Sequence, residues 1–453
     1  MDPQTPSLGT RLTVRITGLN HEGQGVGRTG VQVVFVDGAL PGETVEVIVR
    51  HRAKRHLVAE HRSTLLLSPE RRKPPCILAD RCGGCSLQHL EDGAQARWKH
   101  DTVQQALRRI GGFELDVAPI LAAESPLGYR NRAVIPLERT EEGKLRAGFY
   151  RSGSHRIVNM NRCPVLDPRL DRLIAPIKAD LEQTDWPVDV DLAGEGGLRH
   201  LALRLGRNTG EVLITLISSH RDLPDREVLA EAWMERWPEL VGVCLNLQPQ
   251  ASNTLLGPQT DTLAGRSWLL ERFAAQELRI GADTFFQVNT AQAERLLPLL
   301  IEALAARAGT RLVDAYCGIG TFSLPLAATG ASVVGLEQHP GSVEQARANA
   351  ERNGLERCRF LATEVETALE DALAEADGLL LDPPRKGLAP GVCATIAELA
   401  PARVAYVSCN PATLARDLAL FCAGGRLELI SVQPIDFFPQ TSHVECLAVL
   451  RRL

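Results

Sequence analysis

The chain has 453 residues, of which 44% are hydrophobic and 23% charged, as in ordinary soluble proteins of about three domains. No apolar run reaches the roughly 18 residues that a membrane span needs, and the N-terminal MDPQTPSLGT lacks the features of a secretory signal. The net charge of −5 argues against a uniformly basic nucleic-acid binder. We therefore expect a cytoplasmic protein with no membrane partner.

The first 68 residues are predicted to form a small OB-like β-barrel. Short β-branched runs such as RLTVRITGL, VQVVFV and ETVEVIVRHR alternate with glycine-rich turns over residues 8–65, the spacing of a small barrel. Residues 1–75 carry 11 Lys and Arg against 7 Asp and Glu. A basic end on an acidic protein suits a polyanion such as RNA, although a solvated charged face is the alternative.

Residues 69–290 are predicted to form a mixed α+β domain. Prolines open it, a helical pattern covers about 91–112, and RHLALRLGRNTGEVLITLIS is typical of a β-hairpin. The stretch between that helix and Cys163 is predicted to be irregular and basic. Arginines alternate there with aromatic residues, which suits contact with unpaired RNA, and a solvated face is again the alternative. The residues concerned are Arg130, Arg132, Arg146, Phe149, Tyr150, Arg151, His155 and Arg156.

Four cysteines of this domain have the spacing of a metal site. Cys76, Cys82 and Cys85 share one glycine-containing loop, and Cys163 follows 78 positions later. Disulfides are unlikely in a cytosolic protein, so the thiols are available as ligands. A Cys₄ set fits zinc or a [4Fe–4S] cluster. The three-plus-one arrangement favours the cluster, with zinc and unligated cysteines as alternatives.

Residues 291–453 are predicted to form a Rossmann-like α/β domain. Apolar strands alternate with helical patterns, which is typical of a parallel sheet covered by helices on both faces. The last 26 residues instead contain two strands joined by a loop, so the sheet is predicted to end in an antiparallel hairpin. The predicted strands are RLVDAYC, SVVGLEQ, RFLA, GLLLDPP and RVAYVSC.

Three of these strands end in residues suited to a nucleoside cofactor. Gly318 lies in the turn of DAYCGIG, Glu337 ends the next strand, and Asp382 precedes two prolines. Ligands of open α/β sheets bind at the carboxyl ends of the strands, where an acid can accept hydrogen bonds from ribose hydroxyls. Each feature alone is also ordinary turn chemistry. Together with the terminal hairpin they favour S-adenosylmethionine over a nicotinamide.

The motifs DAYCGIG, DPPRKG, SCNPATLARD and SHVEC, in this order, resemble those of the S-adenosylmethionine-dependent RNA 5-methyluridine methyltransferases. The similarity runs over essentially the whole chain, and residues 8–65 resemble the TRAM domain of that family. The resemblance implies the iron–sulfur cluster as well. By position, the family's cofactor contacts fall on Gln287, Tyr316, Gly318, Thr321, Glu337 and Asp382. Thr321 and Tyr316 stand where asparagine and phenylalanine are common.

This resemblance gives a chemical role to Cys409, at the end of the strand RVAYVS. A thiolate that adds to C6 of uracil makes C5 nucleophilic toward a methyl sulfonium, which is covalent catalysis. The C5 proton must then leave, and Glu445 is the candidate base, with a pKa expected to be raised by burial. Cys317 and Cys446 are interpreted as packing residues. His443 is a candidate for contact with the RNA or for a structural role.

Two other classes of protein remain as alternatives. Asp382-Pro383-Pro384 partly resembles the motif of enzymes that methylate exocyclic nitrogens, but Arg385 stands where those need an aromatic residue. A non-enzymatic RNA-binding iron–sulfur protein would not need its catalytic residues intact. The TRAM domain and cluster cysteines favour 23S ribosomal RNA as the partner, with transfer RNA as the alternative, and a monomer is expected.

Overall fold

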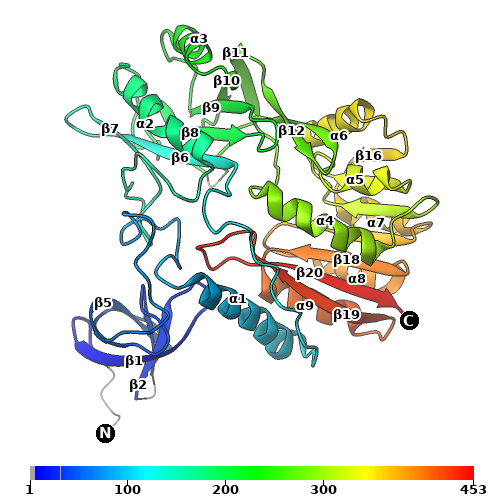
Figure 1. Ribbon diagram of the computed structural model, residues 1–453, viewed down its shortest axis with the longest axis horizontal. Helices are drawn as coiled ribbons and strands as arrows, with labels where there is room; N and C mark the ends of the chain where they lie inside the picture. The colour runs from blue at the N-terminus through cyan, green and yellow to red at the C-terminus, as the bar shows by residue number, and fades with distance from the viewer. Residues whose placement is uncertain (1–5, 31, 253) are drawn as a thin grey trace. The chain divides into compact units, whose positions relative to one another are not determined.

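The computed structural model describes residues 6–30, 32–252 and 254–453. The chain divides into two compact units, and Figure 1 labels many of their helices and strands. The first unit consists of Met1–Thr102, Tyr150–Arg156 and Phe438–His443, and the second of Val103–Phe149, Ile157–Phe437 and Val444–Leu453. The predicted division into domains 1–68, 69–290 and 291–453 stays a prediction.

A closed five-stranded barrel forms the N-terminal part of the first unit. Its strands are β1 (Arg11–Leu19), β2 (Gly25–Thr29), β3 (Gln32–Val36), β4 (Thr44–Arg52) and β5 (His56–Leu66), in the order β1-β2-β3-β5-β4. Alternate residues such as Val14, Val34 and Val47 are buried inside it. This confirms the predicted barrel. The sequence did not indicate β2, because glycine replaces the usual β-branched residues there: a Cβ on Gly27 would lie 2.3 Å from Val14 Cγ1.

The first unit also contains most of helix α1 (Asp92–Ala106), which continues into one π-helical turn, η1 (Leu107–Gly111). This matches the helix predicted over about 91–112. Within the unit, α1 holds the segment Phe438–His443: Lys99 Nζ donates to the Phe438 carbonyl over 3.0 Å, and Gln440 N donates to Gln95 Oε1 over 3.0 Å. That segment leads directly into the last strand of the chain.

A six-stranded sheet occupies the middle of the sequence. Its strands are β6 (Arg132–Arg139), β7 (Leu145–Ala147), β8 (Leu198–Leu205), β9 (Val212–Ser218), β10 (Leu240–Leu247) and β11 (Gln259–Gly265), in the order β11-β10-β9-β8-β6-β7. Helices α2 (Pro168–Glu182) and α3 (Arg226–Arg236) pack on it, and β12 (Trp268–Phe273) and β13 (Gln276–Gly281) form a separate hairpin.

Two expectations for this region have different outcomes. The β8–β9 hairpin is confirmed by its antiparallel pairing. The segment before Cys163 was predicted to be irregular, which is wrong for β6 and β7. Ala133, Ile135 and Leu137 are buried and Val134 is less so, which is close to the period of a half-buried strand, although Pro136 is buried as well. Arginines at both ends of β6 obscured that pattern in the sequence.

A seven-stranded sheet closes the chain. Its strands are β14 (Arg311–Ala315), β15 (Ser332–Glu337), β16 (Cys358–Ala362), β17 (Gly378–Leu381), β18 (Arg403–Ser408), β19 (Leu427–Ile435) and β20 (Glu445–Arg452), in the order β16-β15-β14-β17-β18-β20-β19. The first five in sequence pair in parallel, and β20 is antiparallel to both of its neighbours. The predicted parallel sheet with a terminal antiparallel hairpin is confirmed.

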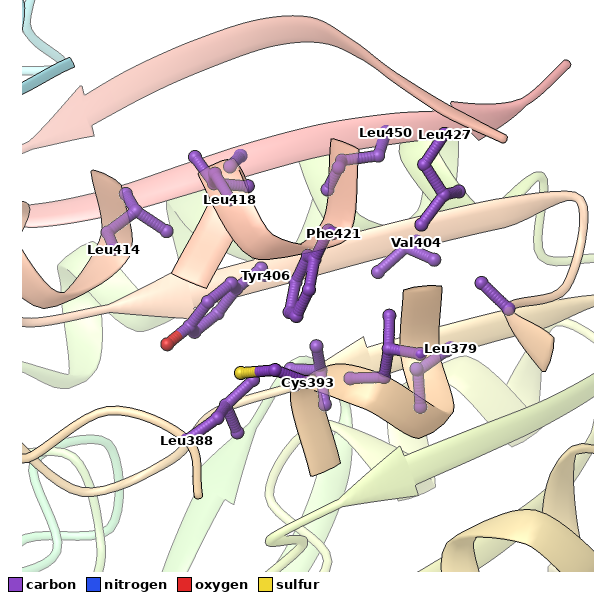
Figure 2. Packing of buried hydrophobic residues seen from close by; sticks show 14 of the residues in the cluster. Leu379, Leu388, Cys393, Val404, Tyr406, Leu414, Leu418, Phe421, Leu427 and Leu450 are labelled. Atoms are coloured by element: carbon purple, nitrogen blue, oxygen red, sulfur yellow. The ribbon is translucent and has the colours of Figure 1, made fainter. Parts of the chain in front are cut away.

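Helices cover this sheet. They are α4 (Thr290–Leu304), α5 (Ser323–Ala328), α6 (Pro340–Arg352), α7 (Val365–Leu373), α8 (Pro390–Leu399) and α9 (Pro411–Cys422). Figure 2 shows the core beneath α8 and α9, where the ring of Tyr406 lies among Cys393, Leu414 and Phe421. Fully burying a side chain of this size contributes roughly 1.5–3 kcal/mol. Among the described residues, no helix is long and apolar enough to span a membrane.

Candidate active site

The turn after β14 brings backbone N–H groups to the carboxyl edge of the seven-stranded sheet. Tyr316, Gly318 and Gly320 all have positive φ, of 70°, 55° and 84°, so the chain reverses sharply. Gly318 N donates to Glu337 Oε2 over 3.2 Å. A Cβ on Gly318 would meet no atom within 4 Å. The glycine is therefore required by its backbone conformation, and the space beside it is open.

Glu337 is held in one orientation by the backbone. Its second oxygen accepts a hydrogen bond from His339 N over 2.7 Å. Gly335 precedes it in β15, where a Cβ would lie 2.5 Å from Phe360 and 2.7 Å from Cys317 Sγ. Cys317 is thus a packing residue, as interpreted from the sequence. The sequence does not indicate that position 335 requires glycine, because the requirement comes from contacts with residues far from it in the chain.

Three carboxyl groups gather at this edge, and that of Asp314 is buried. Burial, with smaller contributions from the charges of Asp382 and Glu337, raises the pKa of Asp314 to about 7 despite a hydrogen bond from Ser323. Burial also raises the pKa of Asp382 to about 7, and Gln287 Nε2 donates to Asp382 Oδ2 over 3.3 Å. Such a group of carboxyls would be stabilised by a cation or by hydroxyl donors. Asp314 was part of the quoted DAYCGIG motif but was not assigned a role.

Cys409 and Glu445 lie at the same end of two paired strands. In the antiparallel pairing of β18 with β20, Ser408 lies opposite Cys446. Cys409 directly follows Ser408 and Glu445 directly precedes Cys446, and the charge of Glu445 acts on the Cys409 thiol. Cys409 is half-buried, whereas only 7% of Glu445 is exposed. The folding back of the last hairpin beside this strand is therefore as predicted.

The two groups influence each other's ionisation. Burial, with a smaller contribution from the charge of Asp382, raises the pKa of Glu445 to about 8 against the opposing charge of Arg385. Burial, with smaller contributions that include the charge of Glu445, raises the pKa of the Cys409 thiol to about 11, and Arg385 again opposes the rise. The expected rise for Glu445 is confirmed. Arg385 is thus a cation that favours the charged forms of both groups.

A buried carboxylate fixes the loop that carries Arg385. Asp417, in α9, is fully buried. Its Oδ2 accepts hydrogen bonds from Tyr406 Oη over 2.8 Å and from Leu388 N over 3.0 Å, and its Oδ1 contacts Arg416 Nη2 at 2.6 Å. Arg416 also donates to the Lys386 carbonyl over 3.3 Å. In Figure 2 the Tyr406 hydroxyl points toward the side where Leu388 lies.

The loop comes so close to α9 that only glycine fits. Gly387 has a φ of 73°, and a Cβ there would lie 2.7 Å from both Arg416 Nη2 and Asp417 Oδ2. At the start of the helix, Asn410 accepts a hydrogen bond from Ala412 N over 3.0 Å, an N-cap. The DPPRKG and SCNPATLARD motifs are therefore one structural assembly. Sequence reasoning missed the role of Asp417, whose only signal is an acid on the apolar face of a helix.

Sequence models of two known families match the chain. The TRAM domain model matches residues 7–60. The model of the tRNA (uracil-5-)-methyltransferase family matches residues 97–453. The chain belongs to the tRNA (uracil-5-)-methyltransferase family.

Relatives of this family resemble the chain along its whole length. An uncharacterized RNA methyltransferase of Parasynechococcus marenigrum is 49% identical, covering 100% of this chain and 98% of the relative. Another from Synechocystis is 46% identical, covering 98% and 96%. The crystal structure of Pyrococcus abyssi tRNA (uracil-54, C5)-methyltransferase with S-adenosyl-L-homocysteine aligns with a TM-score of 0.76 and 27% identity, covering 97% of this chain and 100% of that one. The protein is an S-adenosylmethionine-dependent RNA uracil-5-methyltransferase by family.

The family's remaining site positions lie in the same unit as this edge. Thr321 is buried just before α5, and Tyr316 is partly buried with its pKa raised, chiefly by burial. Cys446 is fully buried, as expected of a packing residue. His443 belongs to the first unit, where its ring meets that of Phe438 edge-on at 5.9 Å. Contact of His443 with the RNA and a structural role for His443 both stay predictions.

The loop with Cys76, Cys82 and Cys85 belongs to the first unit. Leu78 N donates to Cys76 Sγ and Gly84 N to Cys82 Sγ, each over 3.4 Å. Such N–H···S contacts suit thiolates that bind iron or zinc.

Cys163 belongs to the second unit, where it is buried and its N–H donates to Asp171 Oδ1 over 2.5 Å. In the described part of the chain, no three His, Cys, Asp or Glu side chains form a group able to hold a metal. The four thiols are of the ligand type that a cluster needs, and the assembly of the cluster stays a prediction.

Proposed function

We propose that the protein methylates C5 of a uridine in 23S ribosomal RNA through a covalent bond between Cys409 and C6 of the base. The observation that carries this proposal is the pairing of β18 with β20. It supports the proposal because the thiol follows β18 and the buried carboxyl begins β20, at the edge where the other functional residues lie. An enzyme that methylates an exocyclic nitrogen would have no use for that thiol.

The cofactor is proposed to bind at the strand ends described above. The residues that would hold it are Gln287, Tyr316, Gly318, Thr321, Glu337 and Asp382. Glu337 is oriented by two backbone N–H groups and can still accept hydrogen bonds from ribose hydroxyls. The buried carboxyls suit a positively charged ligand, and S-adenosylmethionine, when bound, supplies the methyl group from a sulfonium.

The proposed reaction uses three side chains of the protein. The Cys409 thiolate adds to C6, and the electron pair of the C5–C6 double bond is displaced onto C5 and O4. C5 then takes the methyl group. The Glu445 carboxylate removes the C5 proton, the double bond re-forms, and the C6–S bond breaks to return the thiolate. Arg385 supports the first step because its charge lowers the pKa of Cys409.

The raised pKa of Glu445 is consistent with its role as the base. A carboxylate of pKa about 8 accepts a proton more readily than an exposed glutamate with its ordinary value of 4.5. Brønsted behaviour makes a base of this strength effective near neutral pH. The carboxylate form is also favoured by Arg385.

The four cysteines Cys76, Cys82, Cys85 and Cys163 are proposed to bind a [4Fe–4S] cluster. Spacing, free thiols and the N–H···S contacts support it, and zinc is the alternative. No step of the methyl transfer needs the cluster. Its proposed role is to order the basic segment between Tyr129 and Cys163 for RNA binding.

The choice of 23S ribosomal RNA rests on the TRAM domain together with these cysteines. Transfer RNA is a second candidate, because the family description and the Pyrococcus abyssi enzyme both name it. The test is incubation of the protein and S-adenosylmethionine with each RNA, isolated from a strain that lacks the gene. Mass spectrometry of the digested RNA should find 5-methyluridine formed in 23S ribosomal RNA.

The covalent step is tested separately. RNA containing 5-fluorouridine cannot lose the C5 substituent as a proton, so it should remain bound to the protein on a denaturing gel. The Cys409→Ala variant is the matched control. Methylation without any trapped complex would contradict the covalent mechanism, and methylation confined to transfer RNA would contradict the choice of RNA.

A further inference from the structure

Three arginines form a row beside the segment that carries Gln287. Arg132, at the start of β6, pairs directly with Arg204 of β8, so their side chains leave the sheet on the same face. Arg130 lies two residues before Arg132 on an extended stretch, whose Arg130 N donates to the Val165 carbonyl over 3.0 Å. Two residues is the spacing at which a strand presents side chains to one face.

Within the described part of the chain, this row has no anionic partner. Arg204 is only 6% exposed; its Nη2 donates to the Thr284 carbonyl over 2.6 Å, and its Nη1 has no partner. Arg130 Nε is also buried without a partner. Among the described residues, no carboxylate lies within 4.0 Å of any of the three guanidinium groups. This is unusual, because buried charges are normally paired.

Burying these positive charges without an anion lowers the pKa values of Arg204 and Arg132. Burial lowers the pKa of Arg204 well below its ordinary value, and the charge of Arg132 lowers it further, against a weaker opposite effect of Asp283. Burial also lowers the pKa of Arg132, and Arg130 adds to this. Arginine keeps its proton in proteins. The row is therefore a site of uncompensated positive charge that an anion would stabilise.

The row is connected to the candidate active site by hydrogen bonds. Asn131, between the first two arginines, donates through Nδ2 to the Gln287 carbonyl over 2.9 Å and through its backbone to the Val288 carbonyl over 2.9 Å. Arg204 holds the same segment at Thr284. Gln287 in turn reaches Asp382. An anion bound at the row would thus lie next to the segment that reaches the methylation site.

We propose that Arg130, Arg132 and Arg204 bind a phosphodiester of the RNA strand adjacent to the methylated uridine. This rests on the proposed function and adds Arg204, which lies outside the basic segment identified in the sequence. Guanidinium groups match phosphate oxygens with paired N–H donors. A carboxylate of the cofactor is the less favoured occupant, because every proposed cofactor residue except Gln287 lies at the edge of the seven-stranded sheet.

The test uses the full-length Arg132→Met variant, because the Arg132 side chain makes no hydrogen bond to any described residue and its loss should not disturb the fold. Binding of a labelled oligouridylate is measured over a range of salt concentrations, alongside the affinity for S-adenosylmethionine. Arg451→Gln is the matched control: it removes one positive charge from an exposed arginine paired with Glu428 at 3.0 Å. An Arg130→Met variant provides a second removal within the row.

Both row variants should bind RNA more weakly, and the slope of log K against log salt should fall in magnitude by about one. Cofactor affinity should not change. The thermal midpoint of the RNA-free Arg132→Met variant should be no lower than that of the wild type, since repulsion has been removed. If Arg132 had only a structural role, its replacement by methionine would lower the thermal midpoint.

A slope equal to that of Arg451→Gln would overturn the inference. So would an unchanged slope with weaker cofactor binding, which would assign the row to the cofactor's carboxylate. Failure of the proposed function can be told apart from failure of this inference. If the proposed function is wrong, the wild-type protein will form no 5-methyluridine, whatever the salt dependence of its RNA binding.

Discussion

Replacing Asp417 by alanine should both destabilise the protein and slow methyl transfer. The carboxylate joins helix α9, strand β18 and the DPPRKG loop through its bonds with Arg416, Tyr406 and the Leu388 N–H. Alanine removes all of these acceptors at once. The loop carrying Arg385 would then lose its main attachment to the helix that follows Cys409.

The magnitude follows from the donors left behind. Tyr406 is fully buried and the Leu388 side chain nearly so, and each buried donor without a partner costs about 1–3 kcal/mol. The expected loss in free energy of unfolding is therefore roughly 2–6 kcal/mol. Arg416 adds little, because 47% of its side chain is exposed and it can be solvated. Misplacing Arg385 by about 1 Å can lower kcat by up to about 100-fold.

Urea unfolding measures the first effect, and Tyr406→Phe is the matched control. That variant removes one donor and leaves the Asp417 carboxylate with its other partners, so about 1 kcal/mol should be lost. Single-turnover methylation and cofactor titration measure the second effect, with kcat expected to fall and cofactor affinity to be retained. An Asp417→Ala protein that unfolds at the wild-type urea concentration would refute the reasoning.

Three further predictions concern the site and the cluster. Cys409→Ala should abolish methylation while cofactor affinity stays near the wild-type value, whereas Glu445→Gln should accumulate a methylated covalent RNA adduct on a denaturing gel; normal turnover by Glu445→Gln would assign the base elsewhere. Because burial raises the pKa of Glu445 from 4.5 to about 8, its proton stabilises the fold at acidic pH, and this contribution is lost as pH rises through that interval. Urea titrations should therefore show that Glu445→Gln gains stability relative to wild type between those pH values, and parallel curves would contradict the buried carboxyl. Anaerobically purified protein should contain about four irons per chain, and Cys163→Ala should lose them; one bound zinc and no iron would reject the cluster.

The sequence alone predicted most of the elements, apart from β2, β6 and β7, and together with the family resemblance it indicated much of the chemistry. Alternation of short apolar runs with helical patterns predicts a parallel sheet, because both faces of its strands are buried. The motif order then assigned Cys409 and Glu445 to strand ends. These features are local: each depends on residues within one strand or turn, and their spacing is readable without knowledge of any neighbour.

Tertiary structure decided how those strand ends meet. The pairing of β18 with β20 brings together Cys409 and Glu445, which are 36 positions apart, and their burial sets the pKa of each. In the sequence, Asp417 is an ordinary acidic residue of a helix, and only its contacts with Tyr406 and Leu388 reveal its role. Arg204 likewise reads as a strand residue until its pairing with Arg132 is seen. Burial and pairing are properties of contacts between distant segments, so residue patterns along the chain do not contain them.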